Sequence, residues 1–360
     1  MNKDLPETGV QSGRNGSALI VALWVIVMLS LLVASFAFDM KIEAEITSYY
    51  RNRLKADYLA QGGVELARVI INHSMNVAGT RDDEEYFHED ENIAVAAVNL
   101  SRGVPVLNLQ RELGEGRIFI SITPEEGLRN VNLLSRADWE EILDQSNVPH
   151  ELWDELIATF RDFIEPGDTR RLHGAEPDDP YYTERGYEAK GSRLDSVDEL
   201  LLVKGFTEEI VYGSPAGTPE DDAMLGIAPW LTTWGHGRVN VNTASREVLL
   251  TIRGIDEAVV DAIIEERIGP DGIPGTRDDG FDSLDEVIIR TGMNPGLRED
   301  ISVQEVNYLR VTTIGEVRGV RRVIRCVLRV QDEELIPVSW KEEQLHGSGM
   351  NGYRGTQEAL

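Results

Sequence analysis

The stretch Asn15–Lys41, NGSALIVALWVIVMLSLLVASFAFDMK, is an apolar run between polar flanks. It holds no charged residue over the 22 positions from Ser17 to Phe38. A helix of that length reaches about 33 Å, which is enough to cross the hydrocarbon core of a bilayer. Only Lys3 and Arg14 are basic ahead of it, so the positive-inside rule leaves the N-terminus in the cytoplasm and exports the remainder. The stretch predicts a single-pass membrane anchor.

Helical periodicity continues beyond this run without a breaker. The apolar residues at helical spacing are Ile42, Ile46, Tyr49, Leu54, Tyr58, Gly62, Leu66 and Val69. Such spacing is typical of an amphipathic helix. We therefore expect one helix of more than fifty residues, apolar first and amphipathic later.

Three interpretations of the apolar run compete. It could be a plain signal-anchor, or a signal peptide cleaved after the small residues Ser35 and Ala37. A secretory signal usually has an apolar core of only about 7–15 residues, which is shorter than this run. The third interpretation is a cut at the polar edge, after Gly16, that leaves the helix in the mature protein.

The Gly16–Ser17 junction resembles the cleavage site of type IV pilin-like precursors. The resemblance implies that a prepilin peptidase removes the leader and methylates the new amine of Ser17. The helix would then serve first as an anchor and later as the packing core of a fibre. Most members of this class have Glu at the fifth position after the cut, where this chain has Val21. A carboxylate in lipid needs a partner. A chain without this glutamate resembles the minor pseudopilin K of the type II secretion system, which lies at the fibre tip.

Composition and motifs exclude several function classes. The formal net charge is −28, from 63 acidic and 35 basic residues. Such a surface repels nucleic acids and anionic lipid heads and attracts divalent cations. The single cysteine, Cys326, excludes an intramolecular disulfide. The sequence has no HExxH, G-x-S-x-G or P-loop motif, so we expect neither an enzyme nor a small-molecule substrate.

The remaining chain predicts an α+β fold. Strand-like runs lie at 93–100, 104–109 and 117–122, and again at 306–317, 320–330 and 336–340. Helical patterns from about Leu133 to Ile164 lead into helix-and-loop sequence that continues to about Leu297. We expect a pilin-like long helix with an antiparallel sheet and a large inserted all-α domain. This order resembles the K pseudopilins from Gly16 to Trp340, with GRIFISITPEEGLRNVNLL before the insertion and VSW in the last strand.

These patterns and the resemblance divide the chain into six parts. They are the leader peptide 1–16, the transmembrane helix 17–38, the amphipathic helix and first strands 39–130, the inserted α-helical domain 131–300, the C-terminal strands 301–342 and a flexible tail 343–360.

The inserted region contains a repeat. LDSVDELLLVKGF, from Leu194, and FDSLDEVIIRTGM, from Phe281, share Asp-Ser-x-Asp-Glu followed by apolar residues and a glycine. The acidic and hydroxyl residues suit helix N-termini, and Gly205 and Gly292 suit helix C-caps. Between the copies, VNVNTASREVLLTIRGIDEAVVDAIIEER resembles the helix-hairpin-helix (SAM-like) module of DNA-binding proteins.

The helix-hairpin-helix module makes a membrane-anchored DNA-uptake receptor the alternative function. Such hairpins bind phosphate through backbone N–H groups and nearby basic residues. Here Asp256 and Glu257 follow one hairpin and Glu208 and Glu209 the other. We therefore expect no nucleic acid ligand. An exported anchored domain outside any fibre is the third alternative.

Two acidic loops are candidate calcium sites, because many oxygen donors without thiolate suit a hard cation. The first, RDFIEPGDTRRLHGAEPDDPYY, offers Asp162, Glu165, Asp168, Glu176, Asp178 and Asp179. The K pseudopilins similarly hold calcium at a "GAED"-type phrase, although Pro177 interrupts it here. The second and weaker candidate, GPDGIPGTRDDGFD, offers Asp271, Asp278, Asp279 and Asp282 without EF-hand spacing.

The resemblance also implies the partners and the compartment. The partners would be the minor pseudopilins I and J, with H alongside, and the prepilin peptidase. The chain would lie in the inner membrane with its bulk in the periplasm, where it would start pseudopilus assembly and cap the fibre for protein export across the outer membrane. A related pilus system that uses the same kind of tip subunit is the alternative fibre.

Overall fold

A computed structural model describes residues 15–77, 91–167, 171–219, 223–304, 306–331 and 334–344. Two compact units divide between Lys55 and Ala56. The predicted leader, apart from Asn15 and Gly16, and most of the predicted tail lie outside the described residues.

Helix α1 runs from Asn15 to Val77, 63 residues, which confirms the single long helix. In the second unit its buried face consists mostly of small residues, namely Ala56, Ala60, Gly63, Val64 and Ala67, followed by Ile70 and Ile71. The large apolar side chains at helical spacing were expected to form the buried face of this helix. That expectation is wrong in this part, because Tyr58 and Val69 are 65% and 43% exposed. The reason is close helix–sheet contact: a Cβ on Gly63 would lie 2.8 Å from Ile118 Cγ2.

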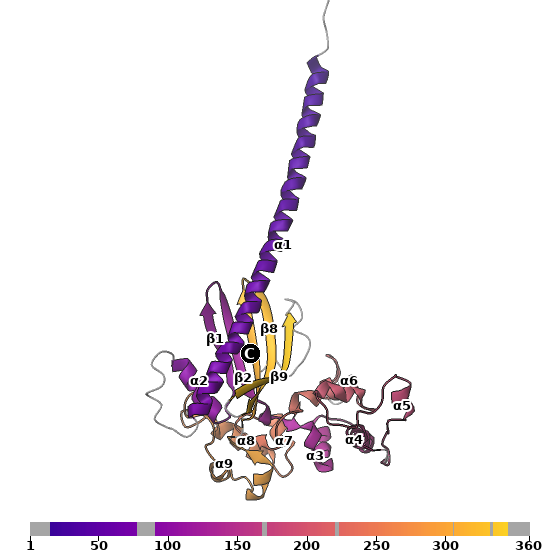
Figure 1. The fold of residues 1–360 in the computed structure, drawn as a ribbon, viewed down its shortest axis with the longest axis vertical. Coiled ribbons are helices and arrows are strands. Elements are labelled where there is room, and N and C mark those ends of the chain that lie inside the picture. The colour runs from indigo at the N-terminus through magenta and orange to yellow at the C-terminus, as the bar shows by residue number, and fades with distance from the viewer. Residues whose placement is uncertain are drawn as a thin grey trace, which may run out of the picture. The chain divides into compact units, whose positions relative to one another are not determined.

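The main sheet is antiparallel with the order β1-β2-β7-β8-β9 (Figure 1). Its strands are β1 (Val106–Leu113), β2 (Gly116–Pro124), β7 (Tyr308–Val317), β8 (Val320–Gln331) and β9 (Glu334–Gln344). All five coincide with strand-like runs in the sequence. Because β2 pairs with β7, with Ile118 opposite Gly315 and Pro124 opposite Leu309, the chain leaves and re-enters the sheet at neighbouring strands.

The strand expected at 93–100 is wrong, because this segment forms helix α2 (Glu91–Ser101). Its residues Ala94, Ala96 and Ala97 are buried, and alanine is the strongest helix former. The apolar run lacks the strict alternation of a half-buried strand. Its helix ends with Ser101 Oγ donating to the Val98 carbonyl at 2.7 Å.

The inserted region packs short helices around a second core. Its α-helices are α3 (Arg136–Gln145), α4 (His150–Ile164), α5 (Pro180–Thr183), α6 (Glu208–Tyr212), α7 (Arg246–Leu250), α8 (Glu257–Glu266) and α9 (Leu284–Thr291). Its 3-10 turns are η2 (Glu125–Gly127), η3 (Val131–Leu133), η4 (Val197–Leu202), η6 (Ala228–Trp230) and η7 (Pro295–Glu299). Aromatic contacts fix the centre, with Trp139 and Phe160 ring centroids 4.9 Å apart.

This region is not wholly helical. Strand β3 (Arg129–Asn130) pairs in parallel with β4 (Leu231–Thr232), and β5 (Val239–Asn240) with β6 (Ile301–Ser302). The α+β class is confirmed, with these two pairs added to the expected helices. Each pair joins segments far apart in the sequence, and the two pairs include the segments where the inserted region begins and ends.

The two repeat copies form different structures. The second copy forms α9, capped by Ser283 and ended by Gly292 in the left-handed conformation, as the sequence predicts. The first copy forms the 3-10 turn η4, capped by Ser196, which ends at Val203. Gly205, with φ of 93°, lies in the turn that leads to α6.

Candidate functional site

Helix α1 is long and apolar enough to cross a membrane, which fits a membrane-anchored protein. The predicted cleavage junction, Gly16–Ser17, lies in its first turn. Val21, at the fifth position after that junction, has a side chain that is 62% exposed. An apolar and exposed fifth position is compatible with lipid and with packing against another helix.

The first acidic loop is organised by an arginine. Asp162, in the last turn of α4, is buried, and its Oδ1 accepts a hydrogen bond from Arg171 Nη1 at 2.6 Å. Its Oδ2 accepts from the Arg171 backbone N at 3.2 Å, and the other guanidinium arm bonds Glu165. Gly174 is required beside this pair because a Cβ there would lie 1.7 Å from Asp162 Oδ2. The guanidinium thus supplies the compensating positive charge for both carboxylates.

The other predicted ligands of this loop are dispersed. Asp179 is buried at the start of α5, where its Oδ1 accepts from Tyr181 N at 2.9 Å and Lys204 Nζ lies 3.2 Å from its Oδ2. Glu176 is buried, Asp178 is exposed, and Asp168 lies outside the described residues. Because Arg171 and Lys204 already meet three of the carboxylates, this arrangement does not fit a calcium ion.

The second acidic loop carries three carboxylates, Asp271, Asp278 and Asp279, that no cation among the described residues compensates. Thr276 Oγ1 donates to Asp278 Oδ1 at 2.6 Å and lies 3.4 Å from Asp279 Oδ1. Asp278 Oδ2 accepts from Asp271 N at 3.2 Å, and Asp279 Oδ2 accepts from Gly275 N at 2.6 Å. In the described part of the chain, no Lys or Arg forms an ion pair with Asp271, Asp278 or Asp279.

The charges in this loop affect one another. Burial raises the pKa of Asp279, and the neighbouring Asp278 and Asp271 raise it further. The hydrogen bond from Thr276 lowers the pKa of Asp278. A divalent cation would relieve this repulsion, so the loop fits a hard cation better than the first does. As the side chains lie, however, no group of three or more His, Cys, Asp or Glu within the described ranges is arranged to hold a metal.

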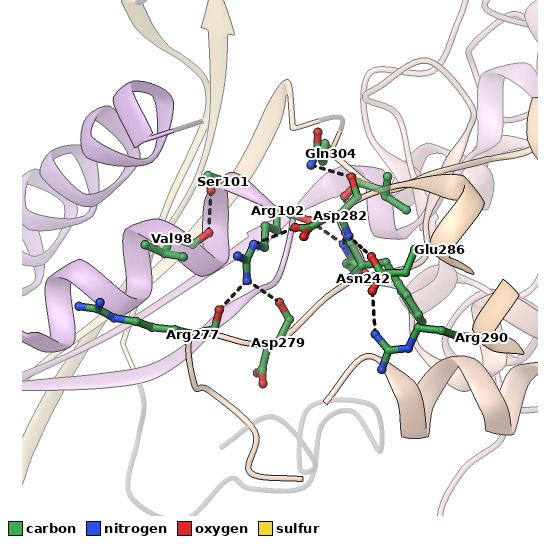
Figure 2. A network of polar contacts seen from close by, with 12 residues as sticks. Val98, Ser101, Arg102, Asn242, Arg277, Asp279, Asp282, Glu286, Arg290 and Gln304 are labelled. Atoms are coloured by element: carbon green, nitrogen blue, oxygen red, sulfur yellow. Dashed lines mark hydrogen bonds and ion pairs between the residues drawn. The ribbon is translucent and has the colours of Figure 1, made fainter. Parts of the chain in front are cut away.

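The fourth residue of this set, Asp282, is held elsewhere. Figure 2 shows it beside Arg102, whose Nε lies 3.2 Å from Asp282 Oδ1. Arg102 Nη1 also donates to the backbone carbonyls of Arg277, at 2.5 Å, and Asp279, at 3.3 Å. Arg102 follows α2, so this side chain ties the second acidic loop to the pilin-like part of the chain.

Asn242 is a structural residue that the sequence reading missed (Figure 2). Its side chain is 3% exposed, and its Nδ2 lies 2.7 Å from the Arg102 carbonyl, 3.0 Å from that of Phe281 and 3.1 Å from that of Val303. Its Oδ1 accepts from Phe281 N at 2.8 Å. One amide thus joins α2, the second acidic loop and the segment leading to β7. The polar residues that alternate with valine in VNVN were the available signal.

The hairpin between α7 and α8 does not form a phosphate site. Gly254 has φ of 92°, as a tight hairpin requires. However, Asp256 caps α8, and its Oδ1 accepts from Val259 N at 2.9 Å. A carboxylate therefore occupies the helix N-terminus that an anion would need.

The chain has a long N-terminal helix packed on an antiparallel sheet, and a helical region lies between two neighbouring strands of that sheet. These features define a pilin-like protein. Residues 120–212 match the family model described as type II secretion system (T2SS), protein K. The chain is 22% identical over 361 residues to type II secretion system protein K of Pseudomonas aeruginosa, covering 93% of this chain and all of that protein.

A solved structure agrees with the sequence comparisons. It is the GspK–GspI–GspJ complex of the type 2 secretion system from enterotoxigenic Escherichia coli, which matches with a TM-score of 0.56 at 13% identity. The match covers 84% of this chain and all of the matched chain. The resemblance to the minor pseudopilin K of type II secretion, predicted from sequence, is thereby confirmed.

Proposed function

We propose that the chain is a minor pseudopilin of type II secretion that initiates the pseudopilus and caps its tip. The observation that carries the proposal is the helical insertion between β2 and β7 of a pilin-like sheet, in a chain similar to protein K over 93% of its length. Helix α1 would anchor the chain in the inner membrane, with the bulk in the periplasm. The role is structural rather than catalytic.

The partners follow from the same likeness. The matched complex contains GspI and GspJ beside its K subunit, and we propose the corresponding minor pseudopilins, with H, as partners here. Val21 supports the position at the tip, because a subunit with no subunit above it needs no carboxylate to pair with an incoming N-terminus.

The first test is the mass and N-terminal residue of the chain purified from its membrane. Processing by a prepilin peptidase predicts a chain that begins at N-methylated Ser17. An intact Met1, or a start after Ala37, would refute the pseudopilin assignment. In the secreting cell, a Val21→Glu protein should then appear along the fibres, and unchanged tip placement would contradict the role given to Val21.

Calcium binding is a separate proposal, and the second acidic loop supports it better than the first. Asp271, Asp278 and Asp279 would hold the ion, which would stabilise the loop by offsetting their mutual repulsion. The test is the thermal midpoint of the full chain with calcium or with a chelator. Asp279→Asn should abolish the calcium-dependent rise, whereas Asp162→Asn should leave it in place. The opposite pattern would transfer the site to the first loop.

A further inference from the structure

Two adjacent glutamates lie where the inserted region begins, and they contact the strand at which it ends. Turn η2 follows β2 directly, and its Glu125 and Glu126 are 1% and 3% exposed. The Glu125 carboxylate accepts from Thr232 Oγ1 at 2.6 Å and from Arg310 Nε at 2.6 Å. Arg310 lies on β7, so the buried Glu125 carboxylate and the half-exposed Arg310 side chain form an ion pair between the segment that enters the insertion and the strand that leaves it.

Glu126 makes the same connection without a positive partner. Its Oε1 accepts from the backbone N–H groups of Asn307, at 2.8 Å, and Tyr308, at 3.0 Å, at the beginning of β7. Its Oε2 is buried and has no hydrogen-bond partner among the described residues. A buried carboxylate oxygen without a donor disfavours the ionised form.

Among the described residues, the surroundings of Glu126 supply no compensating cation. On η2 itself the nearest charge is Glu125, which is of the same sign. On β7 the charged groups are Arg310, whose guanidinium bonds Glu125, and Glu316, which bonds Arg117 and Arg321 near the other end of the strand. Gly235 packs on the Glu126 stem, where a Cβ would lie 3.6 Å from Cγ. Within the described ranges, no Lys, Arg or His forms an ion pair with Glu126 from any of these elements.

We propose that Glu126 is a proton-operated latch that holds the beginning of β7 against the segment entering the inserted region. The neutral carboxyl keeps Oε1 as an acceptor for both amides and carries the proton on Oε2. Loss of that proton places a second negative charge beside Glu125 in a buried site. The ionised group then gains by moving toward water, which frees the amides of Asn307 and Tyr308. The Glu125–Arg310 ion pair forms the other half of the junction.

Linkage gives the size and direction of the effect. Burial raises the pKa of Glu126 from 4.5 to about 7. If the opened latch restores the ordinary value, opening is favoured as pH rises. Between pH 5.5 and 8.5 the population of the opened latch should increase about thirty-fold.

The test is hydrogen–deuterium exchange of the full chain in detergent micelles at these two pH values. Exchange of the Asn307 and Tyr308 amides is divided by the intrinsic rate at each pH, which leaves the opening equilibrium. The wild-type chain should show the increase, and Glu126→Gln, which keeps the shape and the acceptor but cannot ionise, should show none. The matched control Glu112→Gln alters an exposed carboxylate on β1 and should behave as wild type.

A wild-type chain whose corrected exchange at these amides does not change with pH would overturn the proposal without any variant. A Glu126→Gln chain that keeps the wild-type pH dependence would overturn it as well, because another group would then be titrating. Neither measurement depends on membrane processing or on fibre assembly, so the latch is tested independently of the proposed function.

Discussion

Replacement of Asn242 by alanine tests whether one buried amide joins the pilin-like scaffold to the insertion. The variant removes hydrogen bonds to three carbonyls and from one N–H group, at 2.7–3.1 Å. A buried hydrogen bond contributes about 1 kcal/mol net, and a buried group left unpaired costs about 1–3 kcal/mol. Since Nδ2 shares two hydrogens among three carbonyls, we take about 4 kcal/mol as the expected loss in unfolding free energy.

The assay is thermal unfolding of the full chain in detergent, followed by the fluorescence of its 6 tryptophans. For a folded unit of this size, 1 kcal/mol shifts the midpoint by roughly 2–4 °C. Asn242→Ala should therefore lower the midpoint by roughly 10 °C. Asn242→Asp should lower it at least as much, because its second carboxylate oxygen would face carbonyl oxygens in place of the amide hydrogens.

The matched control is Asn76→Ala. Asn76 is exposed on α1, and its Nδ2 donates to the Asn72 carbonyl at 3.1 Å and to no other described residue. Its loss should change the unfolding free energy by less than about 0.5 kcal/mol. An Asn242→Ala chain as stable as Asn76→Ala would refute the reasoning, since the four groups would then have found other partners.

Three further predictions concern the helix–sheet contact and the junction. Gly63→Ala should destabilise the chain by roughly 1–3 kcal/mol in thermal unfolding, since its Cβ would meet Ile118; Gly62→Ala, with no atom within 4 Å of its Cβ, should be neutral or stabilise by up to about 1 kcal/mol. Arg310→Met should cost roughly 2–4 kcal/mol in the same measurement, because it leaves the buried Glu125 charge unpaired, and a loss below about 0.5 kcal/mol would contradict this. Burial raises the Glu126 pKa from 4.5 to about 7, so the folded chain holds a proton that the unfolded chain releases between these values. Stability should fall as pH rises through this window, by on the order of 3 kcal/mol, and the thermal midpoint of Glu126→Gln should lack that part of the fall.

The sequence predicted those helices and strands that bury a single face, because burial of one face produces a regular apolar pattern. Helix α1 and the strands of the main sheet lie where the apolar patterns place them, because each buries one face against a large neighbour. The run at 93–100 failed because alanine and valine in a short buried segment suit either a strand or a helix. Only its tertiary neighbours decide between them.

Contacts that depend on close approach were not readable from the sequence. A helix face chosen by large apolar residues put Tyr58 and Val69 inward, whereas the sheet accepts Ala56, Ala60 and Gly63. The acidic loops posed the same difficulty. Their composition indicates a cation, but only the structure shows that Arg171 compensates two carboxylates of the first loop. In the second loop Arg102 pairs with Asp282, whereas Asp271, Asp278 and Asp279 have no ion pair among the described residues.

The topology explains how a pilin-like scaffold carries so large a domain. Because β2 and β7 are antiparallel neighbours, the two ends of the insertion are adjacent whatever its length. Chain entropy favours a short turn over an open loop of roughly 180 residues by only about 3 kcal/mol, and the insertion has its own core to offset this. The two connecting segments alone do not fix the orientation of the insertion relative to the sheet, because two chain segments side by side act as a hinge. The Glu125–Arg310 ion pair and the Asn242 amide supply that orientation, and Glu126 adds a connection that a proton controls. A domain held in this way can act as a rigid cap on a fibre while only its junction responds to the surrounding medium.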